Sequence, residues 1–407
     1  MRYSGSRAGS LTCSFLAAAL VALLALAALP ARAADSFDAF VADLWPAASA
    51  RGVSRATFDA AFNGVTLDRS ILKLTHKQAE FVKPLWDYLD GAVSASRIEA
   101  GRDSAREWSD TLAKAQSQYG VDQNIVLGVW GLETNFGANA GGRPVIRSLA
   151  TLAYVKYRGA FFRDELLIAL EILEAGHVSP DRMQGSWAGA MGQTQFMPSS
   201  FKDYAVDFNN DGRRDIWSSV PDALGSTANY LRQHGWIAAQ PWGFEVTVPA
   251  GYAPAAADQA GYQSFARWAQ RGFSRPNGEA LPGSGEAQLL MLAGLRGPVF
   301  LVTPNFRVIK SYNTSTAYAL GVALLGDRIA GRGQLKAPWP RGDASLSPSQ
   351  SLAMQRALAA LGYDVGKLDG KLGDKAREAL RDWQTRQGLA ADGYPTPQLL
   401  QRMQNGG

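Results

Sequence analysis

Apolar residues recur along most of this chain with the spacing of helices. Between residues 36 and 120 they return every three or four positions, as in 37–44 and 54–62, and a long helical pattern runs from about 145 to 175. Between 244 and 309 the spacing changes, and Phe244, Val246 and Val248 alternate as in a strand. The pattern predicts a mainly α (α+β) fold in which a small antiparallel β insertion interrupts a helical domain.

Two short apolar runs near the end of this insertion, 299–302 and 306–309, flank Thr303-Pro-Asn305. Such runs on either side of a turn predict a hairpin. Directly after it, the stretch Ser311-Tyr-Asn-Thr-Ser-Thr-Ala-Tyr318 opens another helix.

The last quarter of the chain has its own organisation. Residues 331–346 are rich in Gly, Pro and Arg, as in a linker. Three short helical patterns follow, with predicted caps at Ser347, Asp374 and Thr396 and turns at Asp369-Gly370 and Asp392-Gly393. These features predict a compact three-helix module over residues 347–407.

One predicted helix, from Asp122 to Gly137, carries an unusual charge. Asp122 can cap its start and Gly137 can end it in a left-handed conformation. On a helical wheel, Glu133 falls within the apolar arc, between Val126 and Val129. Apolar surroundings raise the pKa of a carboxyl group, and a carboxyl that stays protonated near neutral pH can act as a general acid. A buried Glu paired with Arg or Lys explains the wheel equally well.

The first 34 residues have the pattern of a secretory signal peptide. Arg2 and Arg7 precede an apolar run from 15 to 29, and Ala31-Arg-Ala33 supplies small residues for cleavage. The single cysteine, Cys13, lies inside this segment, so the mature chain is expected to have no disulfide. Loss of the three arginines lowers the formal net charge from +5 to +2, which gives a nucleic-acid partner little support. We expect an exported protein without a transmembrane anchor in its mature form.

A glycine-rich stretch follows the predicted acid. It reads Gly185-Ser-Trp-Ala-Gly-Ala-Met-Gly-Gln-Thr-Gln-Phe-Met-Pro-Ser-Ser200. Ser186, Gln193 and Gln195 are uncharged hydrogen-bonding groups that suit a polyhydroxylated ligand. Tight helix packing explains the glycines as well.

An Asp-rich loop comes next. Asp207, Asn209 and Asp211 alternate before Gly212, which repeats the first half of an EF-hand calcium loop. Ser218 stands where that loop has its bidentate Glu, and Asp222 is a substitute from further along. An ordinary Asx-rich turn remains the alternative. The three histidines lack zinc-binding spacing, and the chain has no phosphate-cradling loop and no Gly-Xaa-Ser-Xaa-Gly elbow.

Four ordered motifs together resemble the lytic murein transglycosylase B family (glycoside hydrolase family 103) over residues 37–330. They are Gly131-Leu-Glu-Thr-Asn-Phe-Gly137, the stretch 185–200, the Asp-rich loop, and Tyr312-Asn313. The tail from about 346 to 403 resembles a peptidoglycan-binding module. Together with the signal peptide over 1–34 and the linker over 331–346, the resemblance implies a lysozyme-like catalytic domain over 35–330, with its β insertion at about 244–309, and the module over 347–407.

The resemblance also implies a reaction. The family cleaves the β-1,4 bond between N-acetylmuramic acid (MurNAc) and N-acetylglucosamine (GlcNAc) without water and leaves a 1,6-anhydro-MurNAc end. Glu133 would be its only catalytic acid and base. The positions that match the family's glycan groove are Tyr88, Ser186, Gln195, Phe196, Tyr230, Tyr312, Asn313 and Tyr318. Those that match its calcium loop are Asp207, Asn209, Asp211, the carbonyl of Arg213, and Asp222.

The expected partner is therefore the peptidoglycan glycan strand, with cell-wall synthesis proteins left open as further partners. The expected location is the periplasm, because no lipid-attachment cysteine follows the signal. No cofactor is expected for catalysis, and Ca²⁺ is expected as a structural ion. A lysozyme-like muramidase, which is a hydrolase, and a non-catalytic peptidoglycan-binding protein are the alternatives.

Overall fold

The computed structural model describes residues 36–76, 84–254, 261–332, 334–343 and 345–405. The predicted signal peptide lies outside these ranges. Within them, every helix is too short or too polar to cross a lipid bilayer.

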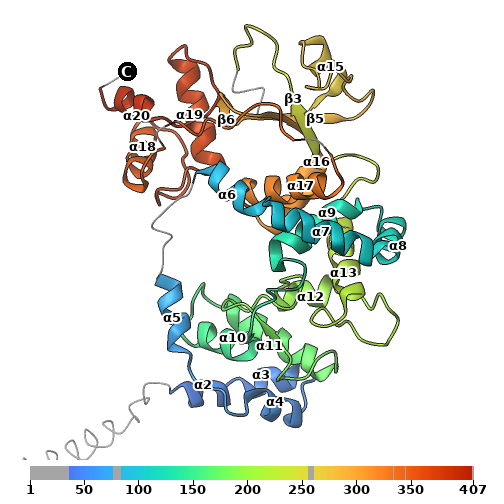
Figure 1. Cartoon of the computed structure of the whole chain (residues 1–407). Helices are drawn as coiled ribbons and strands as arrows, with labels where there is room; N and C mark the ends of the chain where they lie inside the picture. The colour runs from blue at the N-terminus through green and yellow to red at the C-terminus, as the bar shows by residue number, and fades with distance from the viewer. Residues whose placement is uncertain (1–35, 77–83, 255–260, 333, 344, 406–407) are drawn as a thin grey trace, which may run out of the picture.

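Most of the described chain forms one helical body (Figure 1). A single buried apolar cluster, which extends from Phe37 to Ile329, holds it together. The helices α9 and α17 lie side by side at its centre. The helices of the body are α2 (Phe37–Ala42), α3 (Trp45–Ala50), α4 (Arg55–Phe62), α5 (Arg69–His76), α6 (Leu85–Ala92), α7 (Ala95–Glu107), α8 (Ser109–Tyr119), α9 (Gln123–Thr134), α10 (Val145–Tyr154), α11 (Phe161–Glu174), α12 (Pro198–Tyr204), α13 (Val220–Gln233), α16 (Pro304–Tyr312) and α17 (Thr316–Ile329).

Side-chain caps explain where several of these helices begin. The side chains of Ser54, Asp122 and Ser219 each accept a hydrogen bond from a free backbone N–H in the first turn of α4, α9 and α13. The predicted long helix over 145–175 is instead two helices. Between them Lys156, Arg158 and Gly159 all have positive φ, which breaks the helical backbone.

The insertion contains a four-stranded antiparallel sheet in the order β3-β7-β5-β4. Its own apolar cluster includes Phe244, Trp268 and Leu301. Its elements are β3 (Gly243–Val246), β4 (Gln263–Ser264), α15 (Phe265–Gln270), β5 (Glu286–Leu290), β6 (Leu292–Leu295) and β7 (Val299–Val302). A separate pair, β1 (Arg143–Pro144) and β2 (Gln184–Gly185), lies in the helical body.

The predicted hairpin after residue 299 is wrong in its second half. Residues 299–302 form β7, but residues 306–309 lie in α16. The Thr303 hydroxyl accepts a hydrogen bond from the backbone N–H of Asn305, and Pro304 occupies the first helical position. Threonine followed by proline is a helix-start signal, and it outweighs the short apolar run that suggested a strand.

The C-terminal module consists of α18 (Pro348–Ala360), α19 (Asp374–Arg386) and α20 (Pro397–Gln404) around its own buried cluster. Two buried glutamines hold its Asp-Gly turns. Gln355 accepts from the N–H of Gly370 at 2.7 Å, and Gln384 accepts from the N–H of Gly393 at 2.9 Å. The mainly helical prediction, with a β insertion and a small helical tail, is confirmed.

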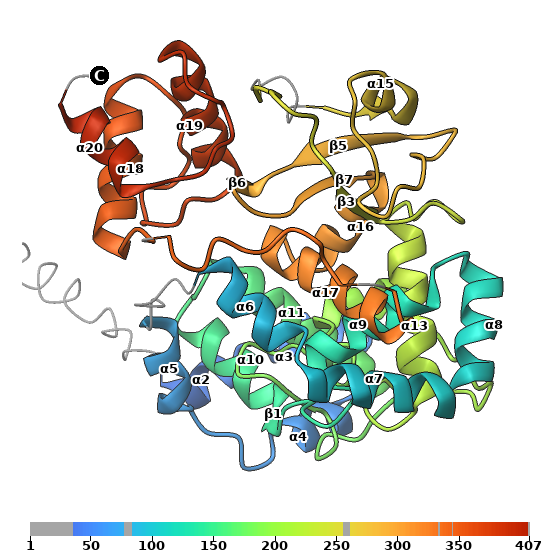
Figure 2. The ribbon, with the colours of Figure 1, turned by 45° about the horizontal axis from the view of Figure 1, so that its top comes forward.

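The module packs against the insertion, with α19 beside β6 (Figure 2). The guanidinium of Arg377 donates a hydrogen bond to the carbonyl of Leu292 at 3.2 Å. The predicted cap at Asp374 is wrong, since Gly373 is the N-cap of α19 and forms no side-chain cap bond. The Asp374 carboxylate instead accepts a hydrogen bond from Lys310 of α16 at 2.7 Å.

The linker before the module is fixed to the helical body and the insertion at several points. The Glu245 carboxylate accepts hydrogen bonds from the backbone N–H groups of Lys336 and Ala337, both at 2.7 Å. Arg341 forms a two-pronged pair with Asp90 of α6, at 2.7 and 2.8 Å. The described linker residues therefore follow a defined path over the surface.

Candidate active site

Glu133 is the next-to-last residue of α9. The helix ends three residues earlier than predicted, because Asn135 already takes the left-handed conformation and Phe136 and Gly137 follow it with positive φ. The Trp130 indole and the Thr134 hydroxyl anchor this end of the helix on Gln193, by hydrogen bonds of 3.0 Å each. These contacts fix the position of Glu133.

The surroundings of Glu133 favour its neutral form. Burial raises the pKa of this carboxyl to about 7, and a hydrogen bond from the Tyr318 hydroxyl, 2.5 Å from Oε1, opposes part of the increase. Tyr318 lies in the first turn of α17, and burial beside Glu133 raises its own pKa well above the ordinary value. At neutral pH Glu133 can therefore both give and take a proton.

A salt bridge was the alternative explanation for a carboxylate in an apolar arc. Among the described residues, no Arg or Lys lies within ion-pair distance of Glu133. The ionisable neighbours that act on it electrostatically are Tyr88, Tyr312 and Tyr318. Tyrosines at neutral pH add no charge, so they leave the raised pKa in place.

Three of the predicted groove residues form one aromatic cluster. The ring centroids of Phe196, Tyr230 and Tyr312 lie 4.7–5.9 Å apart. The Tyr312 hydroxyl donates to the carbonyl of Thr194 at 2.8 Å, and the Tyr230 hydroxyl donates to the carbonyl of Ser311 at 2.7 Å. The cluster thus ties the loop before α17, and with it Tyr318, to the glycine-rich stretch.

Tyr88 and Asn313 are the exposed members of the predicted set. Tyr88 lies on α6, is 36% exposed and packs against Gly321 of α17. Asn313 is exposed at the end of α16, where its side chain accepts a hydrogen bond from the N–H of Ser315 at 3.0 Å. Both lie on segments that adjoin α17, near Tyr318.

Gln195 and Ser186 lie in the glycine-rich stretch but use their polar atoms locally. Gln195 has a φ of 52°, a strained conformation for a residue with a side chain, and donates to the carbonyls of Ala140 and Gly192. The Ser186 hydroxyl accepts from the N–H groups of Ala188 and Ala190. Neither residue contacts Glu133 in a hydrogen bond.

The glycines of this stretch permit close approach of the backbone. A side chain at Gly185 would overlap the carbonyl of Ala190, and one at Gly192 would overlap the carbonyl of Ile216. The structure thus favours compact turns over the helix packing that was the alternative. Gln193, which seemed suited to a ligand, is buried and structural, because its amide binds Trp130 and the carbonyl of Trp217.

The Asp-rich loop brings carboxylates together. Oxygen atoms of Asp207, Asp211 and Asp222 all lie within 4.8 Å of one another. Asp222 comes from the first turn of α13, and its carboxylate also accepts hydrogen bonds from the N–H groups of Phe208, Asn209 and Asp215. Three hard oxygen donors around one point fit a Ca²⁺ ion.

The other two predicted ligands stand beside this group. The side-chain oxygen of Asn209 accepts from the N–H of Asp211 at 3.0 Å. The guanidinium of Arg213 lies 3.6 Å from the Asp211 carboxylate. The role of the Arg213 carbonyl stays a prediction.

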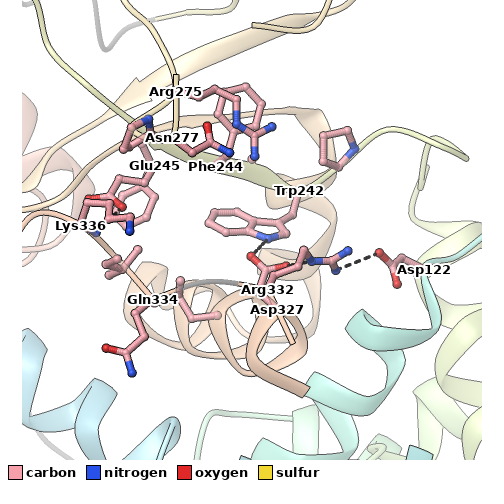
Figure 3. A pocket seen from close by; sticks show the side chains of 16 residues that line it. Asp122, Trp242, Phe244, Glu245, Arg275, Asn277, Asp327, Arg332, Gln334 and Lys336 are labelled. Atoms are coloured by element: carbon pink, nitrogen blue, oxygen red, sulfur yellow. Dashed lines mark hydrogen bonds and ion pairs between the residues drawn. The ribbon is translucent and has the colours of Figure 1, made fainter. Parts of the chain in front are cut away.

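A pocket of about 350 Å³ lies away from Glu133, between β3, the end of α17 and the linker (Figure 3). Most of its charged side chains are already paired. Asp327 accepts from the indole of Trp242 at 3.1 Å and from Arg332 at 2.7 Å, and Arg332 also reaches Asp122. Glu245 is bound to the linker backbone. The pocket therefore joins structural elements and offers few free polar groups.

Comparison with known proteins gives a consistent result. A family model described as transglycosylase SLT domain matches residues 36–327, and one for a peptidoglycan binding domain matches residues 348–403. Membrane-bound lytic murein transglycosylase B of Escherichia coli (strain K12) is 36% identical over 276 residues, which are 64% of this chain and 74% of that protein.

Solved structures are similar over larger parts of the chain. SltB3 from Pseudomonas aeruginosa, in complex with NAG-anhNAM-pentapeptide, has a TM-score of 0.86 and 46% identity and covers 91% of this chain and 99% of its own. The Escherichia coli lytic transglycosylase SLT35, in complex with calcium, has a TM-score of 0.60 and 30% identity and covers 72% of this chain and 92% of its own.

Proposed function

The chain belongs to the transglycosylase SLT domain family and is a lytic transglycosylase that acts on peptidoglycan, and from this premise we propose its product and its mechanism. The enzyme cleaves the β-1,4 bond between MurNAc and GlcNAc without water. It leaves a 1,6-anhydro-MurNAc end and serves in turnover and remodelling of the cell wall. The carboxyl of Glu133, with a pKa of about 7 and one hydrogen bond from Tyr318, is the observation that carries this proposal.

Glu133 would act twice. Protonated, it donates its proton to the glycosidic oxygen as the bond from C1 of MurNAc breaks, and the substrate's own acetamido oxygen bonds to C1. As a carboxylate it then accepts the proton of the C6 hydroxyl. The C6 oxygen attacks C1, the acetamido group is released, and the proton is back on Glu133. A group with a pKa near the working pH suits both steps.

The exposed and aromatic side chains around Glu133 would hold the glycan. Tyr88 offers an exposed ring face of the kind that stacks on sugars, and Tyr312 a partly exposed one. Phe196 and Tyr230 are buried, so they would support the groove wall from behind, and Ser186, Gln195 and Asn313 offer hydrogen-bonding groups. Tyr318 would orient the Glu133 carboxyl toward the bond.

Analysis of the products separates this proposal from its two alternatives. Sacculi digested with the whole protein should release muropeptides that end in 1,6-anhydro-MurNAc, each lighter by one water than the product of hydrolysis. Mass spectrometry detects this difference. Reducing MurNAc ends would identify a muramidase, and an absence of soluble products would identify a non-catalytic binding protein.

The Asp-rich loop is proposed to bind Ca²⁺ as a structural ion through Asp207, Asn209, Asp211, the Arg213 carbonyl and Asp222. Calcium should raise the melting temperature relative to a chelator, because an ion that binds only the folded state adds about 2.7 kcal/mol at a hundredfold excess over its Kd. The Asp207→Asn variant should melt at the same temperature with calcium and with chelator, as measured by calorimetry. The Asp203→Asn variant, which changes an exposed residue outside the cluster, should keep the difference in melting temperature. Identical melting curves with calcium and with chelator would show that the loop is only a turn.

The site of action is proposed to be the periplasm, which residues 1–34 would reach as a cleaved signal peptide. Peptidoglycan strands are the proposed substrate of the catalytic domain and the proposed ligand of the C-terminal module.

A further inference from the structure

A second pocket, of about 410 Å³, lies where the C-terminal module meets the rest of the chain. Strands β5, β6 and β7 of the insertion line one side, α16 and the start of α17 a second, and α19 of the module a third. Its charged lining consists of Arg307, Lys310, Asp374, Arg377, Glu378 and Arg381. Four cationic side chains thus face two carboxylates, and the pocket is electropositive.

Three of these cations form no direct ion pair in the described part of the chain, although carboxylates of α19 lie near Arg377 and Arg381. Arg377 uses its donors on the carbonyls of Leu292, Leu372 and Gly393, and no ion pair within 4.0 Å involves Arg307, Arg377 or Arg381. Burial lowers the pKa of Arg377 and of Arg381, which shows that both charges have lost part of their hydration. Asp374, by contrast, is already bound by Lys310. Arg307 and Arg381, which form no ion pair among the described residues, therefore favour an anionic ligand.

The remaining lining is apolar. The side chains of Leu290, Leu292 and Phe306 contribute to it, next to Tyr262. A ligand that combines carboxylates with small apolar groups would match both parts of the wall. A short peptide with free carboxylates has this composition, whereas a glycan chain of N-acetylated sugars does not.

A single loop connects the wall of this pocket with the residues around the proposed acid, Glu133. Lys310 and Thr316 line it, and their side chains are joined by a hydrogen bond of 2.9 Å. The residues between them form the loop 311–315, which carries Tyr312, and Tyr318 follows two residues after Thr316. The loop that carries Tyr312 thus connects the surroundings of Glu133 with the wall of this pocket.

We propose that this pocket binds the carboxylates of the stem peptide attached to MurNAc, so that the module and the insertion together recognise peptide-bearing strands. The inference rests on the proposed function, because peptidoglycan must be the substrate. It assigns Arg307 and Arg381 to the bound carboxylates, while Arg377 holds the two parts of the wall together.

Binding to the whole protein tests the proposal. The probes are a GlcNAc–MurNAc fragment with its pentapeptide and the same fragment without peptide, measured by calorimetry. Arg307→Gln and Arg381→Gln should each weaken binding of the peptide-bearing fragment by about tenfold, the scale of one lost charge-assisted hydrogen bond. Glu378→Gln should strengthen it, since it removes a negative charge from the pocket. Binding of the peptide-free fragment should not change.

Two controls keep the result interpretable. Arg356→Gln removes the same charge from an exposed position of the module outside the pocket and should leave both affinities unchanged. Arg381→Lys keeps the charge and should retain most of the binding if Arg381→Gln acts through charge and not through misfolding. Equal loss for both fragments, or equal loss with Arg356→Gln, overturns the proposal. So does competition by acetate or phosphate at the concentrations at which the free pentapeptide competes.

The same variants distinguish this inference from the proposed function. If the inference holds, they still release anhydro products from peptide-free glycan strands, and only peptide-bearing strands show a higher KM. If the unmodified protein releases no anhydro product from any strand, the proposed function fails, and the binding data still decide the role of the pocket.

Discussion

Replacement of Glu133 by glutamine is expected to abolish release of anhydro-muropeptides, with a loss of about 10²- to 10⁴-fold or more in kcat, the range for a general acid–base group. Glutamine has nearly the same shape as glutamate but neither donates an acidic proton nor accepts one. Glycan binding should remain, because the aromatic cluster is unchanged. Mass spectrometry of sacculus digests and a binding measurement on the same preparation check both parts.

The same substitution is expected to stabilise the fold at high pH. The pKa of Glu133 rises from 4.5 to about 7 on folding, so the folded state binds this proton more tightly than the unfolded state. The resulting penalty is absent below pH 4.5, grows between pH 4.5 and 7 and is complete above pH 7, where it reaches roughly 3 kcal/mol at most. Glutamine avoids it, so the variant should melt later than the parent at pH 8 and like the parent at pH 4.

The exposed Glu99 on α7 is the matched control. Glu99→Gln should change neither activity nor the pH dependence of melting. Retained activity in Glu133→Gln would remove Glu133 from its proposed role. Equal melting temperatures of parent and Glu133→Gln at pH 8 would contradict the raised pKa.

Replacement of Tyr318 by phenylalanine is expected to shift the pH profile of kcat/KM to higher pH. The Tyr318 hydroxyl stabilises the charged form of Glu133, so its loss leaves burial unopposed and raises the pKa above about 7. Since protonated Glu133 is the proposed acid, kcat/KM should fall at a pH about one unit higher than in the parent. A profile of kcat/KM from pH 5 to 9 measures the midpoint.

Tyr312→Phe provides the comparison for this shift. Its hydroxyl donates to the carbonyl of Thr194 and not to Glu133, so the variant should lose activity without a change in the midpoint. A midpoint that stays in place in Tyr318→Phe, or moves to lower pH, would contradict the proposed hydrogen bond.

Local signals in the sequence were sufficient for much of the fold. Asp122 caps α9 as predicted, and the alternation of Phe244 and Val246 marks β3. Where a turn or helix-start signal competed with an apolar pattern, the apolar pattern predicted the structure less well. The Thr303-Pro304 start of α16 overruled the apolar run 306–309, and the loop at Lys156 to Gly159 broke an otherwise continuous helical pattern.

The candidate site was predictable only in part. The wheel placed Glu133 among apolar residues, but its hydrogen bond from Tyr318 joins residues far apart in the chain, for which no spacing rule exists. The same holds for the hydrogen bond from Trp130 to the buried Gln193 and for the hydrogen bond from Lys310 to Asp374. Such contacts depend on how whole elements pack, and therefore only coordinates show them.

The attachment of residues 336, 337 and 341 to Glu245 and Asp90 limits the positions that the C-terminal module can take relative to the helical body. A flexible linker would let the C-terminal module take many distances from the groove. It would then raise the local concentration of glycan strand over all of these distances. In this structure the linker contacts hold the C-terminal module at one position relative to the groove. A strand that occupies the groove and the module at the same time must therefore span a distance that the fold sets.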